Sequence, residues 1–102
     1  MSSRLTFDAE LWASESVAAW VFVTVPADVS EAIRDESAAL EPKGFGSLRV
    51  EARIGTTTWR TSVFPDAGSG CFVLPVKKAV RAAEGLDVGD PTAVSLLVLD
   101  EH

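Results

Sequence analysis

The sequence is poor in the residues on which several classes of protein depend. It contains one cysteine, Cys71, and its one histidine, His102, is the last residue. A lone thiol excludes an intrachain disulfide, and nothing indicates an oxidising compartment. Cys71 has no histidine to activate it, and no Cys/His cluster has the spacing of a metal site. The sequence therefore predicts no catalytic residue, no metal and no cofactor.

Long hydrophobic runs are also missing. The longest, VAAWVFV, has seven residues, whereas a transmembrane helix needs about 20. The first residues, MSSRLTFDAELW, lack the apolar stretch of a secretory signal peptide. We therefore expect a protein that does not enter a membrane and that resides in the cytoplasm.

Charge is plentiful but unevenly distributed. The formal net charge is −6 over 102 residues, which is the size of a single domain. Residues 43–81 carry seven basic and two acidic residues, a net charge of +5, and the rest of the chain carries −11. The acidic total disfavours general nucleic-acid binding, but a local basic block can attract an anion if the fold gathers it on one face. The alternative is that these basic side chains have no ligand and simply lie on solvent-exposed faces of strands and helices.

The first part of the chain predicts two strands. Between residues 4 and 14, apolar and polar residues alternate with the period of a half-buried strand. Residues 20–25, WVFVTV, are β-branched and aromatic and predict a central strand that ends at Pro26. The two segments are close enough in sequence to form a hairpin with its turn at Glu15 and Ser16.

A helix is predicted over residues 28–40, DVSEAIRDESAAL. Asp28 and Glu31 have the spacing of an acidic capping box, and Pro42 lies just beyond the end. The residues expected to share its inner face are Val29, Ile33, Ser37 and Leu40.

The middle of the chain predicts an antiparallel hairpin. Residues 48–54 alternate apolar and charged side chains, Gly55 begins a turn, and residues 58–64 form the returning strand. A loop rich in glycine follows, and then a short strand, CFVLP, at residues 71–75.

The last third predicts a second short helix and a final strand. Pro75 has the fixed φ that suits a first helical turn, and Gly85 is placed to end the helix. The inner face would carry Val76, Ala79, Val80 and Ala83. Gly89 and Asp90 form a turn into the strand PTAVSLLVL. The whole pattern predicts one mainly β domain over residues 1–102, a small barrel of about six or seven strands with two short helices inserted.

Several motifs occur in the order found in one known family. They are the GFG turn at residues 44–46, V-x-x-x-I-G at 50–55, W-x-T-S-x-F-P at 59–65, L-P-V-K-K-x-V-R at 74–81, and Gly-Asp at 89–90. The sequence resembles, over nearly its whole length, the family called domain of unknown function 1905. The resemblance implies a double-split β-barrel, distantly similar to swapped-hairpin DNA-binding proteins of AbrB type. It implies no established activity.

The candidate ligand-binding residues lie in the basic block. They are Trp59, Arg60, Thr61, Ser62, Lys77, Lys78 and Arg81. Trp59 is either a stacking platform beside Arg60 or Lys77, or a core residue. Lys77 and Arg81 are neighbours one helical turn apart, where their like charges repel each other, and this indicates an anionic partner. The alternative is a solvated face on which Glu84 pairs with Lys78 or Arg81. Thr61 and Ser62 offer hydroxyl groups.

Three functions follow as alternatives. The first is a non-enzymatic binding module whose basic surface takes a small anionic ligand or an acidic protein partner. The second is a nucleic-acid-binding regulator of AbrB type, which would require a dimer that pools two basic faces. The third is an enzyme whose site has no recognisable residues. The sequence is compatible with a monomer or a homodimer.

Overall fold

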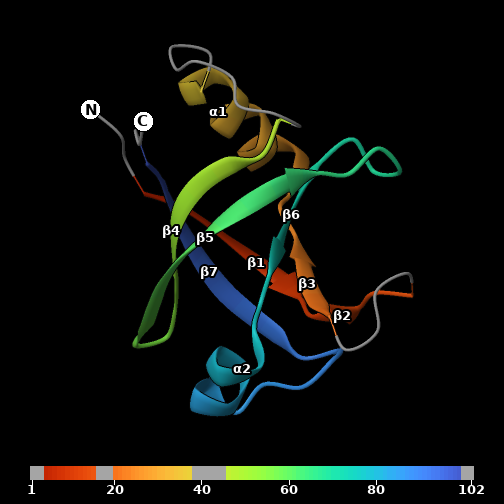
Figure 1. The fold of residues 1–102 in the computed structure, drawn as a ribbon, viewed down its shortest axis with the longest axis vertical. Coiled ribbons are helices and arrows are strands. Elements are labelled where there is room, and N and C mark those ends of the chain that lie inside the picture. Colours follow the sequence, from red (N-terminus) through yellow and green to blue (C-terminus); the bar gives the residue numbers. More distant parts are fainter. Residues whose placement is uncertain (1–3, 16–19, 38–45, 100–102) are drawn as a thin grey trace.

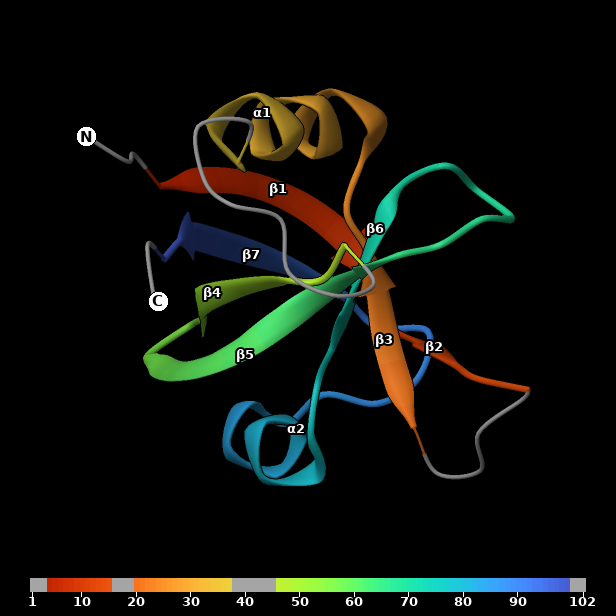
Figure 2. The same cartoon turned by 45° about the horizontal axis from the view of Figure 1, so that its top comes forward.

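The computed structural model describes residues 4–15, 20–37 and 46–99, which form seven strands and two short helices (Figure 1). The strands curve into a nearly closed barrel, which confirms the predicted mainly β class. The strands are β1 (Leu5–Glu10), β2 (Trp12–Ala13), β3 (Val21–Thr24), β4 (Leu48–Ile54), β5 (Thr57–Pro65), β6 (Phe72–Pro75) and β7 (Pro91–Val98). The helices are α1 (Ala27–Ser37) and α2 (Lys78–Glu84), at opposite ends of the barrel (Figures 1 and 2).

Hydrogen bonding runs through the strands in the order β1-β7-β4-β5-β6-β3-β2, and every pair is antiparallel. β1, β7, β4 and β5 form one half of the barrel, and β6, β3 and β2 form the other. The two halves meet where Phe64 and Pro65 of β5 pair with Val73 and Phe72 of β6. This short ladder leaves most of β5 with β4 as its only strand partner among the described residues.

The first predicted strand is in fact two strands, so the predicted hairpin with residues 20–25 is confirmed for β2 and wrong for β1. β1 pairs with β7, and only β2 pairs with β3. The break falls at Leu11, whose N–H donates to the carbonyl of Asp90 at 3.1 Å and whose carbonyl accepts from Gly89 at 2.7 Å. The turn before β7 therefore takes these backbone groups, and the chain crosses between the halves at this point. Of the predicted turn, Ser16 lies outside the described residues.

The predicted hairpin of residues 48–64 is confirmed as β4 and β5. Their register places Ile54 opposite Thr57, so a two-residue turn joins them. Gly55 in this turn has φ +59°, which glycine adopts without steric cost. Val50 and Ala52 face the core, while Arg53 points to solvent.

Helix α1 begins at Ala27, one residue before the predicted capping box, so the assignment of Asp28 as the cap is wrong. Ser30 N–H already donates to the carbonyl of Pro26 at 2.7 Å, which places Asp28 within the first turn. A carboxylate there still favours the positive end of the helix dipole. The predicted end at residues 40–42 lies outside the described residues.

Ser30 fastens α1 to the barrel, a role that its sequence position did not reveal. Its side chain is fully buried, and Oγ donates to the carbonyl of Val25 at 3.0 Å and accepts from the N–H of Phe72 at 3.1 Å. Ile33 on the same helix is also fully buried. The helix therefore covers one end of the barrel through one polar and one apolar anchor.

The prediction that Pro75 begins the second helix is wrong, because Pro75 is the last residue of β6. Val76 N–H donates to the carbonyl of Val21 at 2.9 Å, which keeps the chain extended beyond the proline. Lys77 is the N-cap, with an extended conformation, and α2 starts at Lys78.

Helix α2 buries less of its surface than its sequence predicts. Val80 is buried, but Ala79 and Ala83 are exposed, because this short helix lies across the rim of the barrel. Gly85 ends the helix with φ +64°, and the N–H of Leu86 donates to the carbonyl of Arg81 at 2.9 Å. The predicted stop at Gly85 is therefore confirmed.

The core fills the barrel with aliphatic side chains from every long strand. Val23, Val50, Val63, Leu74 and Leu96 have no accessible surface. No helix in the described ranges is long and apolar enough to cross a membrane.

Candidate functional site: a cationic cleft beside β5

The barrel opens along β5 because the ladder to β6 cannot continue. The register that pairs Phe64 with Val73 would next bring Pro75 opposite Ser62. Proline has no N–H to donate, so the ladder ends there. Beyond this point β5 and the chain leading to α2 diverge (Figure 1).

The other end of this opening is closed by a contact between β5 and α2. Thr57 Oγ1 donates to Glu84 Oε2 at 2.6 Å, in a partly buried position. Gly55 lies beside the same carboxylate, since a Cβ at Gly55 would come within 2.8 Å of Glu84 Cδ. The opening is therefore bounded by a strand ladder at one end and by a hydrogen bond at the other.

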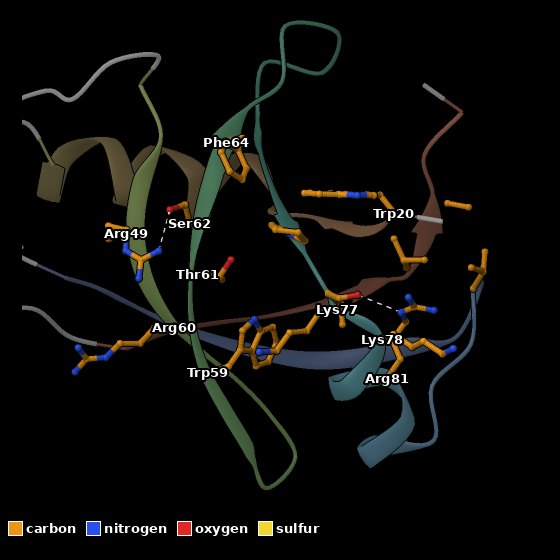
Figure 3. Close-up of a pocket in the computed structure, with 15 residues that line it drawn as sticks. Trp20, Arg49, Trp59, Arg60, Thr61, Ser62, Phe64, Lys77, Lys78 and Arg81 are labelled. Carbon is orange, nitrogen blue, oxygen red and sulfur yellow. Dashed lines mark hydrogen bonds between the residues drawn. The ribbon is translucent and has the colours of Figure 1, made fainter. Parts of the chain in front are cut away.

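A cleft of ≈ 960 Å³ occupies this opening (Figure 3). Its walls come from β5 on one side and from Pro75 to Arg81 on the other. All seven residues selected from the sequence line it: Trp59, Arg60, Thr61, Ser62, Lys77, Lys78 and Arg81. Among the described residues, the lining includes five basic side chains and no acidic one.

Three of the cations lie together at the α2 side of the cleft. Lys77 and Lys78 are exposed, and Arg81 is half-buried. Arg81 Nε donates to the carbonyl of Val76 at 3.1 Å, which fixes the position of its guanidinium group (Figure 3). Because Glu84 turns away to Thr57, the alternative in which Glu84 pairs with Lys78 or Arg81 is wrong. The three positive charges are therefore left without a carboxylate partner among the residues that line the cleft.

Arg49, Arg60 and Ser62 belong to the outer side of the β4–β5 hairpin. Arg49 Nη1 donates to Ser62 Oγ at 3.5 Å. Arg60 extends away from Trp59, to the opposite side of β5 (Figure 3). The prediction that Arg60 and Trp59 form one stacking site is therefore wrong, because neighbouring residues of a strand point to opposite faces.

Trp59 is a core residue that also forms part of the cleft wall. Its exposed fraction is 8%, and it packs within the same buried cluster as Val63. A ring this enclosed cannot present a face for stacking, so the core alternative describes it and the stacking alternative is wrong. Thr61, also on the inner side of β5, is half-buried between Trp59 and Phe64 (Figure 3).

The cleft has an apolar side that sequence reasoning missed. Trp20 is 49% exposed, Phe64 is 40% exposed and Val88 is 53% exposed, and all three line the cleft. For Phe64, the sequence did contain a signal of this apolar surface. Phe64 occupies a position in residues 58–64 where the strand period requires a polar, outward-facing residue, and a large ring there indicates a binding surface. Trp20 gave no such signal, because the residues that follow it are almost all apolar.

The chain was compared with known proteins. The family model described as Domain of unknown function (DUF1905) matches residues 7–96. No curated protein matches the chain. The matched segment includes every strand that lines the cleft. Because it covers most of the 102 residues, the chain belongs to the DUF1905 family.

Proposed function

We propose that this protein is a binding module that holds a small anionic ligand in the cleft beside β5. The observation that carries the proposal is the convergence of Lys77, Lys78 and Arg81 on one side of a cleft that no acidic side chain lines within the part of the chain that the structure describes. The proposal assigns no reaction to the site.

The electrostatics of the cleft favour an anion. Lys78 and Arg81 lie on one turn of α2, and Lys77 is its N-cap. Like charges this close repel each other, and an anion between them removes that repulsion and gains charge-assisted hydrogen bonds. Arg81 is already held by Val76. Less side-chain entropy is therefore lost when a ligand binds.

The shape of the cleft supports a small ligand over a polymer. Its volume of ≈ 960 Å³ falls in the range of about 300–1,000 Å³ typical of small-molecule sites. The β5–β6 ladder and the Thr57–Glu84 hydrogen bond block the ends through which an extended chain would have to pass. An acidic protein partner or a nucleic acid would have to use the rim alone, and no contact in the structure favours either.

Isothermal titration calorimetry with citrate and with inorganic phosphate, at low ionic strength, tests the proposal. Lys78→Gln removes one positive charge from the cleft. Arg53→Gln is the matched control, because Arg53 is an exposed residue of β4 that does not line the cleft. We expect Lys78→Gln to weaken anion binding about tenfold, the loss of one charge-assisted hydrogen bond. Arg53→Gln should leave binding unchanged. Equal effects of the two substitutions, or no binding to the wild type, would refute the proposal.

A further inference from the structure

Three of the five cations that line the cleft lie apart from its exposed aromatic rings. Lys77, Lys78 and Arg81 lie toward α2, whereas Phe64 lies toward the end where β5 meets β6, and Trp20 lies on the other side of β6 (Figure 3). A fully hydrated anion such as phosphate would use the first group and leave the second exposed to water. The exposed rings of Trp20 and Phe64 therefore indicate a second, apolar part of the ligand.

Resting on the proposed function, we propose that the ligand is an amphipathic organic anion. Its carboxylate, phosphate or sulfate group would lie against Lys77, Lys78 and Arg81. An aromatic or branched aliphatic group would lie against Trp20 and Phe64.

The exposed aromatic rings carry this inference. Large apolar side chains that line a concave surface cost free energy in water, and that cost is removed when an apolar ligand covers them. Trp20 is 49% exposed and Phe64 is 40% exposed. Covering the exposed part of each side chain with an apolar group would gain the kind of stabilisation that burial gives in a core.

Trp20 is held in place before any ligand arrives. Its ring packs against Phe22 with 5.8 Å between ring centroids, and Phe22 packs against Trp12 at 5.1 Å. Val21 and Val76, which are buried, form the wall behind the cleft and are joined by a backbone hydrogen bond of 2.9 Å. The apolar side is therefore a preformed surface, so binding needs little reordering of the protein.

Thr61 lies between the two sides. Its side chain is half-buried on the inner side of β5, between Trp59 and Phe64 (Figure 3). A hydroxyl at this depth can donate to, or accept from, a polar atom that links the anionic and apolar parts of a ligand. The order along the cleft is thus cationic, polar and apolar.

The occupant is a small molecule and not a second copy of the chain. The cleft is bounded at both ends, by the pairing of Phe64 with Val73 and by the contact of Thr57 with Glu84. A dimer interface needs a broad surface that a folded partner can cover, whereas this cleft is a recess with the volume of a small-molecule site.

Titration calorimetry with three probes separates the two parts of the ligand. 2-Naphthoate carries an anion and an apolar ring system, 2-naphthamide carries the ring system without the charge, and citrate carries charge without the rings. We expect 2-naphthoate to bind at least about tenfold more tightly than either of the others, because only it uses both sides.

Two tryptophan variants identify the apolar side. Trp20→Ala should weaken 2-naphthoate about tenfold and leave citrate unchanged. Trp12→Ala removes a similarly exposed ring that supports Phe22 but does not line the cleft, so it should weaken 2-naphthoate clearly less than Trp20→Ala does. Circular dichroism checks that both variants keep the native fold.

The outcomes distinguish this inference from the proposed function. If citrate binds as tightly as 2-naphthoate and Trp20→Ala changes neither, the apolar part is refuted and the anion site stands. If no probe binds, both proposals fail. If light scattering shows a wild-type dimer that Trp20→Ala converts to a monomer, the aromatic surface is an interface between copies, and the small-molecule inference is overturned.

Discussion

Replacing Trp59 by alanine tests whether the cleft is built on the core of the barrel. Trp59 lies on β5 with an exposed fraction of 8%, although it also lines the cleft. A buried aromatic side chain removes about 200 Å² from water. At about 25 cal/mol per Å² this area is equivalent to ~5 kcal/mol.

Two corrections reduce this figure. The unfolded chain already buries part of the same surface, which lowers the value by roughly 10–40%. The cleft also lets neighbouring side chains and water fill some of the space that the ring leaves. We therefore expect Trp59→Ala to lower the free energy of unfolding by about 3 kcal/mol, at the low end of the range of about 3–5 kcal/mol for such substitutions.

Urea unfolding followed by circular dichroism measures the change, and Trp12→Ala is the control. Trp12 is 37% exposed, and its Nε1 donates to Thr24 Oγ1 at 3.0 Å. Because less of it is buried, we expect a loss of about 1 kcal/mol. A loss below about 1 kcal/mol for Trp59→Ala, or equal losses for the two variants, would refute the assignment of Trp59 to the core.

Two further predictions concern the ends of the cleft. Gly55→Ala should destabilise the protein by about 1–3 kcal/mol in urea unfolding, because alanine is strained at φ +59° and its Cβ displaces Glu84. The loss should shrink in a Glu84→Ala background, and an undiminished loss would show that the contact is unimportant. Pro75→Ala restores an N–H opposite Ser62 and should extend the β5–β6 ladder. Residue 75 should then show slowed amide hydrogen exchange, and rapid exchange would contradict this account of the opening.

Local patterns in the sequence were sufficient for most of the elements. The alternation in residues 48–64 and the turn at Gly55 predicted the β4–β5 hairpin, because both depend on neighbours within a few residues. The stop at Gly85 was predictable for the same reason. The errors at Asp28 and Pro75 are shifts of element ends, where hydrogen bonds to the carbonyls of Pro26 and Val21 decided the boundary.

The basic part of the candidate site was also predictable, since its residues stand close together in the sequence. What the sequence could not show is the side of each strand or helix that meets the cleft. Arg60 turns away from Trp59, and Glu84 leaves Lys78 and Arg81 to reach Thr57. Trp20 joins the cleft from the position just before β3, far in sequence from β5 and α2. Such contacts depend on how distant segments pack, which local propensity does not encode.

The sequence by itself determined most of the strands, the end of the second helix and the presence of a basic block, because alternation, turn chemistry and charge are local properties. Only the tertiary structure decided that the block forms a cleft. Pro75 ends the ladder opposite Ser62, α2 closes the far end through Glu84, and the barrel brings Trp20 to the rim. Each of these depends on a pairing between segments distant in the chain, and the register of that pairing exists only once the barrel has folded.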